Sequence, residues 1–358
     1  MLGSRLRIAR AAMRLSLREL SERISGLVSP QAIGKYERGE DIPSPPVLKA
    51  LSVALGVSVA HLETEEQLTL ESVEFRRGMN SAKEEASVQA KAITLLQHYL
   101  EIEAILGLES TDWEKPRGVP FPVNDLRDAE DAARSVREAW SLGNDPIPRL
   151  AELLEERGIK VLSVDLDDID GLAAYAPRRD RDPARVIVVK RNTWSERKRF
   201  TMAHELGHMV LGLTTSINAE KAAHRFAGAF LLPADMLRAE VGATRSTISL
   251  GELAALKRRY GVSLQALTYR CRELGIISEA TFSELFKVFA ERGWRAPPFK
   301  EPECMPEEYE LPRRFERLCL RAYSEKLIDI SHASELLGTP EGNLKKRLSF
   351  DWHIEAPD

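Results

Sequence analysis

Residues 203–211 of this chain read AHELGHMVL and place two histidines four positions apart. On an α-helix, residues with this spacing lie one above the other on the same face. His204 and His208 can therefore direct their imidazole rings at a single ion, which requires the segment to be helical. Most residues that flank the pair are apolar, so we expect this helix to be buried.

His204, Glu205 and His208 form the HExxH pattern of zincin metallopeptidases. Zinc takes imidazole nitrogens and carboxylate oxygens in a tetrahedral shell, and it lowers the pKa of a water molecule to about 7. Glu205 lies beside the first histidine, where a carboxylate can take the proton of that water. Gly207 leaves room for a metal, a substrate or a packed strand. The alternative interpretation is an ordinary helix with two packed or exposed histidines.

A zinc site of this kind needs a third protein ligand. Position 214 is Thr214, which excludes the zincin class that has a histidine there. The next predicted helix, AEKAAHRFAGAFLLP, begins near Ala219 and carries Glu220 and His224 on one face. We expect Glu220 to complete the ligand set and His224 to form hydrogen bonds outside it. The reverse assignment is the alternative, because both residue types bind zinc.

The segment RFTMAHELGHMVL followed by EKAAHRFAGAFLLP resembles the ImmA/IrrE family of bacterial metallopeptidases. The resemblance covers roughly residues 125–280. It implies that His204, His208 and Glu220 bind Zn²⁺ and that Glu205 is the catalytic base. The family often has asparagine at the position of His224. Its members cleave transcription factors of the repressor type, which implies a repressor as the protein partner.

Three short β-type runs separated by turn residues lie directly before the HELGH helix, at residues 159–166, 171–176 and 184–189. They predict a small three-stranded sheet that backs the helix in an α+β domain. The run ARVIVV, residues 184–189, has two interpretations. It is an edge strand to which a peptide substrate adds as a further strand, or it is a central core strand.

The start of the chain is basic although the whole chain carries a net charge of −4. Residues 1–38 contain more basic than acidic side chains, namely Arg5, Arg7, Arg10, Arg14, Arg18, Arg23, Lys35 and Arg38 against Glu19, Glu22 and Glu37. The segment SLRELSERISGLVSPQAIGKYERGEDIP resembles the XRE (Cro/lambda-repressor-like) helix-turn-helix, over residues 2–64. In that family an arginine and a glutamate lock the first helix to the third, and Arg10 and Glu37 occupy these positions.

Helix signals agree with this resemblance: Ser16 and Glu19 form a capping box, and Pro30 follows the N-cap residue. A recognition helix enters the major groove by its N-terminal residues. We expect Gln31 to contact an adenine and two basic residues to contact phosphates. The predicted DNA-binding residues are Ser29, Gln31, Ala32, Lys35 and Arg38. The alternative is a helical bundle that docks a protein or forms a dimer.

The predicted fold is mainly α-helical. A five-helix bundle spans residues 1–66, a helical linker spans 67–124, and the zincin-like α+β domain spans 125–280. The linker ends in the proline-bearing segment 111–124. The C-terminal region, 281–358, is helical and amphipathic, and it has three interpretations: homodimerisation, sensing of a signal, or capping of the core.

Cys271, Cys304 and Cys319 are far apart, which argues for a reducing cytoplasm and against cysteine ligation of a metal. No apolar run is long enough to span a membrane, and no secretory signal is expected at the start. The preferred hypothesis is a cytoplasmic bacterial regulator that binds double-stranded operator DNA and cleaves a repressor or antitoxin. Its own segments 111–124 and 40–46 are further candidate cleavage sites.

A second hypothesis keeps the DNA-binding regulator or antitoxin but makes its peptidase-like domain a sensor or a partner-binding module without proteolysis. A third is a protein-interaction scaffold with neither activity. The presence of every catalytic residue type favours the first hypothesis over the third.

Overall fold

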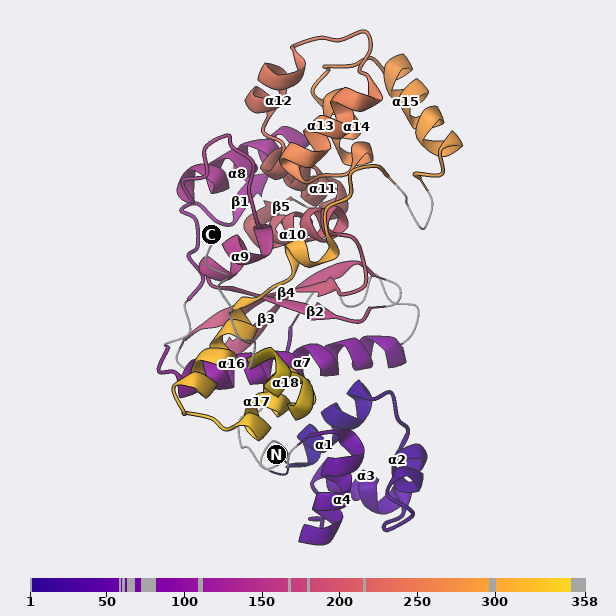
Figure 1. Ribbon diagram of the computed structural model, residues 1–358, viewed down its shortest axis with the longest axis vertical. Helices are drawn as coiled ribbons and strands as arrows, with labels where there is room; N and C mark the ends of the chain where they lie inside the picture. The colour runs from indigo at the N-terminus through magenta and orange to yellow at the C-terminus, as the bar shows by residue number, and fades with distance from the viewer. Residues whose placement is uncertain are drawn as a thin grey trace, which may run out of the picture.

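The computed structural model describes residues 2–57, 59, 62, 68–71, 82–108, 112–166, 169–178, 181–214, 217–295 and 301–348. Helices dominate these residues, and a three-stranded sheet and a two-stranded sheet accompany them. The predicted mainly α fold class is therefore confirmed. Figure 1 shows a helical bundle at one end, the three-stranded sheet in the middle and a second group of helices at the other end.

The N-terminal bundle, here called the head, consists of α1 (Leu2–Ala12), α2 (Leu17–Arg23), α3 (Pro30–Arg38) and α4 (Pro45–Leu55). Local signals set its helix ends. The Ser16 hydroxyl accepts from the Glu19 backbone N–H and the Glu19 carboxylate caps the Ser16 N–H, which confirms the predicted capping box. Gly39 ends α3 in the left-handed conformation, with φ 72°. The predicted fifth helix falls on residues 58–67, which lie almost entirely outside the described residues.

A long helix, α7 (Ala82–Ile105), connects the head to the rest of the chain and packs on both sides. One side contacts α1 of the head, and the other contacts strand β2 and helix α16. Buried apolar residues of α7, among them Ile93, Leu96 and Ile102, share a core with the sheet. The segment predicted as a helical linker therefore contains a helix that is part of the core.

The three-stranded sheet consists of β2 (Ile159–Val164), β3 (Gly171–Arg178) and β4 (Arg181–Lys190), in the order β2-β4-β3. β4 is parallel to β2 and antiparallel to β3. The edge-strand interpretation of residues 184–189 is therefore wrong, because β4 is the central strand. Its run of buried β-branched residues is typical of a strand covered on both faces.

A second sheet was not predicted. β1 (Phe121–Val123) pairs in parallel with β5 (Leu211–Leu213), which directly follows the HELGH helix. β1 lies in the proline-bearing segment 111–124, so that segment is in part a strand. Two helices follow it, α8 (Leu126–Ala139) and α9 (Leu150–Glu156).

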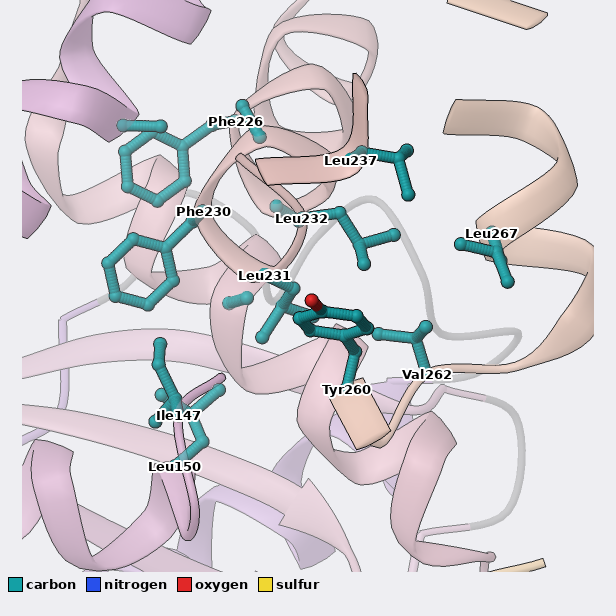
Figure 2. Close-up of a cluster of buried hydrophobic side chains, with 14 of the residues drawn as sticks. Ile147, Leu150, Phe226, Phe230, Leu231, Leu232, Leu237, Tyr260, Val262 and Leu267 are labelled. Carbon is teal, nitrogen blue, oxygen red and sulfur yellow. The ribbon is translucent and has the colours of Figure 1, made fainter. Parts of the chain in front are cut away.

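The helices on the other side of the sheet enclose a second core. They are α10 (Ser195–Val210), α11 (Ala219–Leu231), α12 (Ala234–Val241), α13 (Leu250–Tyr260), α14 (Leu264–Glu273) and α15 (Glu279–Glu291). Figure 2 shows Phe226 and Phe230 of α11 in this core, with Leu237, Tyr260 and Leu267 contributed by the helices that follow. The same buried side of α11 packs on α10, where Phe226 and Ala223 lie against Gly207.

The C-terminal region returns along the molecule to α7. A short 3-10 helix, η1 (Glu307–Glu310), precedes α16 (Arg314–Ser324), α17 (Ile330–Leu337) and α18 (Glu341–Leu348). The buried Glu310 carboxylate pairs with Arg199 and accepts from the backbone N–H groups of Leu150 and Ala151. This region therefore fixes α10 to α9. Among the described residues, no helix has both the length and the apolar character needed to cross a membrane.

Candidate metal centre and DNA-binding head

Helix α10 brings its two histidines together as the spacing predicts. Nε2 of His204 lies 3.0 Å from Nε2 of His208, and the two rings are nearly perpendicular. The sheet backs this helix, since α10 packs on β3 and β4. His204 and Glu205 are buried, at 9% and 5% exposure.

Helix α11 adds two further donors. The Glu220 carboxylate lies 3.2 Å from Nε2 of His204 and 3.8 Å from Nε2 of His208. One donor atom from each of His204, Glu220 and His224 lies within 4.8 Å of the other two. The His204 and His224 rings are 4.4 Å apart at their centroids. The structure therefore brings all four predicted residues together.

Close packing of α10 on α11 makes this convergence possible. A Cβ placed on Gly207 would lie 3.1 Å from Cδ1 of Phe226 and 3.2 Å from Cα of Ala223. Gly207 thus leaves room for a helix, and not for the strand considered as one of its roles. At the start of α11, the Asn218 side chain accepts from the Lys221 backbone N–H and fixes the turn that carries Glu220.

The electrostatics of the cluster suit a metal. Burial above all, together with the neighbouring His208 and His224, lowers the pKa of His204 to about 3. His204 is therefore neutral at neutral pH, the form in which imidazole binds a metal. Nδ1 of His224 donates to the Glu220 backbone carbonyl at 2.9 Å, which leaves Nε2 as the acceptor nitrogen. A hydrogen bond of this kind is usual for histidines that ligate metals.

The donor set fits zinc. Two imidazoles and a carboxylate are ligands that zinc accepts. In a tetrahedral site with Zn–N bonds of about 2.0–2.1 Å, two ligand nitrogens lie roughly 3.3 Å apart, and the two Nε2 atoms lie 3.0 Å apart. Among the described residues, Nδ1 of His204 is buried and has no hydrogen-bond partner. A metal bound at Nε2 would leave this nitrogen without a partner.

Glu205 lies beside the first residue of β3. A Cβ on Gly171 would come within 2.5 Å of Cγ2 of Thr201 and 2.7 Å of the Val188 carbonyl oxygen, and 3.8 Å from Cγ of Glu205. Only glycine allows α10 to lie this close to the strand. Gly171 was not among the predicted site residues, although a glycine at the start of a β run is a signal of close backbone approach.

A cavity of about 630 Å³ opens next to the metal cluster, between α11 and α14. Glu220 and His224 line one end, and Phe200, Leu126 and the half-exposed Tyr269 supply apolar walls.

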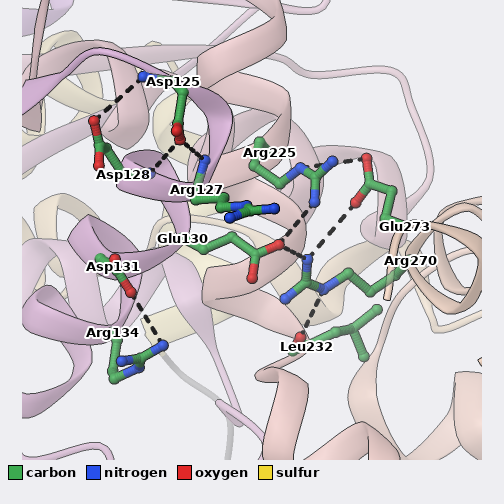
Figure 3. A network of polar contacts seen from close by, with 10 residues as sticks. All are labelled: Asp125, Arg127, Asp128, Glu130, Asp131, Arg134, Arg225, Leu232, Arg270 and Glu273. Carbon is green, nitrogen blue, oxygen red and sulfur yellow. Dashed lines mark hydrogen bonds and ion pairs between the residues drawn. The ribbon is translucent and has the colours of Figure 1, made fainter. Parts of the chain in front are cut away.

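An ion-pair network in the wall of the cavity fixes α11 to α8 and α14 (Figure 3). The Glu130 carboxylate accepts from Arg225 at 2.8 Å and from Arg270 at 2.5 Å. Burial acts to raise the pKa of Glu130, but the two guanidiniums outweigh it and the pKa is lowered. Arg270 also donates to the Leu232 carbonyl, and Glu273 lies 3.7 Å from each arginine. Arg225 directly follows His224, so the network restrains the helix at the metal cluster.

In the head, the predicted arginine–glutamate lock is present. Nε and Nη2 of Arg10 donate to the two Glu37 oxygens at 2.6 and 2.8 Å, and Nη1 donates to the Leu15 carbonyl. The pair connects α1 to α3. A Cβ on Gly3 would lie 2.2 Å from the Tyr36 carbonyl oxygen, so α1 and α3 are also in close backbone contact.

The residues expected to contact DNA lie at the start and along one side of α3. Gln31 and Lys35 are exposed, and Ala32 is partly exposed. The Ser29 hydroxyl accepts from the Ala32 backbone N–H, so it already caps the helix. Arg38 is exposed but pairs with Glu40 at 2.6 Å. Exposed pairs of this kind contribute little and break easily.

The sheet-backed pair of helices with its histidine and carboxylate cluster defines a domain of the peptidase type, carried on one chain with a helix-turn-helix bundle. Residues 154–272 match the family model of the IrrE N-terminal-like domain, peptidase M78. Residues 6–62 match the helix-turn-helix family model. Both matches confirm the architecture that the sequence resemblance implied. No match to this chain is found among curated proteins.

Proposed function

We propose that this protein is a zinc-dependent endopeptidase that is also a DNA-binding transcriptional regulator, and that it cleaves a protein partner of the repressor or antitoxin type. The convergence of Glu220 with His204 and His208 carries the proposal. Zinc at this position would supply a Lewis acid that polarises a water molecule and a peptide carbonyl. His204, His208 and Glu220 would hold it, and His224 orients the Glu220 segment by its hydrogen bond.

Glu205 acts as the general base in this proposal. Its carboxylate belongs to the same buried helix as the two histidines, so its position relative to them is set by helix geometry. The strand β3 passes close beside it, because a Cβ on Gly171 would lie 3.8 Å from the Cγ of Glu205. Glu205 takes a proton from the attacking water and delivers it to the leaving amine.

The substrate pairs with the outer edge of β3 at Gly171 and Ala173. Both the N–H and the carbonyl of Tyr175 point away from β4, since they bond to Glu71 at 2.9 and 2.8 Å. In an antiparallel strand this orientation repeats every second residue, so Ala173 and Gly171 present the same edge. A peptide added there would pass Glu205. Strand addition gives affinity through main-chain hydrogen bonds, and the cavity at Tyr269 receives a large side chain.

In this proposal, DNA binding by the head determines where the peptidase acts. The α3 helix reads operator DNA through Gln31, while Lys35 and Arg38 contact phosphates. Gln31→Ala should lose about 1–3 kcal/mol of discrimination at one base pair, and operator affinity should fall steeply with salt. An operator affinity that is independent of salt would contradict this role.

The test uses zinc content and cleavage together. Wild-type protein and Glu205→Gln are loaded with zinc and incubated with the repressor encoded beside the gene, and the products are identified by mass spectrometry. Both proteins should contain one zinc ion, and only the wild type should cleave. His332→Gln is the matched control, because His332 pairs with Glu101 away from the cluster and should change neither result.

A protein without zinc would overturn the metal site. Zinc without cleavage in either protein would support the second candidate, in which the domain is a sensor or binds a partner without proteolysis. One observation favours that candidate: α1 of the head packs on α7, and α7 packs on the sheet that backs α10. A structural change at the metal centre can therefore be transmitted to the head through helices and strands that pack against each other.

A further inference from the structure

A cavity of about 660 Å³ lies between the head and the rest of the molecule, away from the metal cluster. Figure 1 shows the two helices that border it, α1 and α7, lying against each other. Among the described residues its walls are mainly apolar, with Ile8, Ala11 and Leu15 on the head side and Ala90 and Ile93 on the α7 side. Leu68 closes it from the segment before α7.

Positive charge also lines this cavity. Arg7 and Arg10 lie one turn apart on α1, and Arg14 follows in the turn after the helix. No acidic residue is among the described residues of the wall. Arg10 is engaged by Glu37 of α3. Nε of Arg14 donates to the buried Ser87 hydroxyl at 3.4 Å, which ties this guanidinium to the α7 wall.

The backbone at Arg14 ends helix α1. Arg14 has φ 56°, in the left-handed region. Its N–H donates to the Ala11 carbonyl and the Leu15 N–H donates to the Arg10 carbonyl, a usual pattern where a helix ends in a left-handed residue. This turn fixes the point at which the Arg14 side chain leaves the backbone, and from there its guanidinium reaches Ser87 of α7.

We propose that this cavity binds a small amphipathic anion, a carboxylate or sulfonate on an apolar body. The anionic group lies between Arg7 and Arg14, and the apolar body lies against Ile8, Leu68 and Ile93. The volume is within the range of roughly 300–1,000 Å³ that is usual for small-molecule sites. Arginine forms strong charge-assisted hydrogen bonds with such groups. The proposal is independent of the metal site and of any proteolysis.

The position gives the site a second property. An occupant touches α1 and α7 together, and Arg10 in its wall also holds Glu37 of α3. Binding should therefore protect backbone amides of both α1 and α7 from hydrogen exchange. It should leave the metal cluster on α10 and α11 unaffected, because no residue of these two helices is among the described residues of the wall.

Octanoate and 1-octanol test the proposal, because they share an apolar chain and differ in charge. Isothermal titration of the full chain should show one octanoate site, with protection of α1 and α7 in hydrogen exchange. Arg14→Gln should weaken octanoate about tenfold, the usual loss of one charge-assisted bond, and change 1-octanol less than about twofold. Arg18→Gln, an exposed arginine outside the cavity, is the matched control and should bind as the wild type does.

A second variant tests the cavity itself. Ala86→Phe adds bulk at an exposed wall position on α7 and should block both ligands while the thermal unfolding temperature is retained. Three results would overturn the proposal: no octanoate binding at millimolar concentration, equal binding of octanoate and 1-octanol, or binding that both variants leave unchanged.

Discussion

The Glu220 carboxylate on α11 lies 3.2 Å from Nε2 of His204 on α10. This contact distinguishes the two candidates for the third ligand. If Glu220 binds the metal, Glu220→Ala should lower zinc affinity by well over 100-fold, beyond the roughly 10–100-fold loss expected for His224→Ala as an orienting residue. Competition titration with a zinc chelator measures both affinities. A larger loss in His224→Ala than in Glu220→Ala would reverse the assignment.

Gly171 should be intolerant of a side chain. Gly171→Ala places a Cβ 2.5 Å from Thr201 Cγ2 and 2.7 Å from the Val188 carbonyl oxygen. Because backbone must shift, the free energy of unfolding should fall by about 1–3 kcal/mol. Gly251→Ala is the matched control, since nothing lies within 4 Å of its added Cβ. It should be neutral or stabilise α13 by up to about 1 kcal/mol in the same urea titration.

The Arg10–Glu37 pair should stabilise the head. Glu37→Gln leaves a half-buried guanidinium without its carboxylate, so the head should lose about 2 kcal/mol, below the 3–5 kcal/mol of fully buried pairs. Thermal unfolding followed by circular dichroism should show this loss. Glu22→Gln removes the partner of Arg18 in a highly exposed pair and should change stability by less than about 1 kcal/mol. Equal effects of the two variants would contradict a structural role for the lock.

Stability should fall between pH 4.5 and pH 7 because of Glu155. Burial raises the pKa of this carboxyl from 4.5 to about 7, despite hydrogen bonds from the Arg314 backbone N–H and the Tyr99 hydroxyl. The folded state therefore holds a proton that the unfolded chain releases, and the contribution is lost as pH rises through this window. Its size is on the order of 3 kcal/mol.

Glu155→Gln should remove this pH dependence, because the amide does not titrate. Urea unfolding at pH 5 and pH 7 measures the difference in the free energy of unfolding for both proteins. Glu152→Gln, a more exposed carboxylate on the same helix, should keep the slope of the wild type. A slope that persists in Glu155→Gln would assign the proton to another group.

Much of the fold could be predicted from local signals. Ser16 with Glu19 and Pro30 predict helix starts from residues that are close in the chain, and both helix starts are present. The three β runs and the helical C-terminal region were also predicted correctly. The order of the strands was not, because buried edge and central strands can have the same composition. Pairing of Phe121–Val123 with Leu211–Leu213 had no signal, since each segment is too short to show a pattern.

For the candidate site, the sequence by itself determined that His204, Glu205 and His208 share one stretch of helix, because helix geometry relates residues that are close in the chain. Only the tertiary structure decided that Glu220 and His224 meet them, that Gly171 lies against Glu205, and that Arg14 lines a cavity with α7. These contacts join residues that are distant in sequence. They depend on how closely the surfaces of separate elements can pack, and the spacing of residues within one element does not determine this packing.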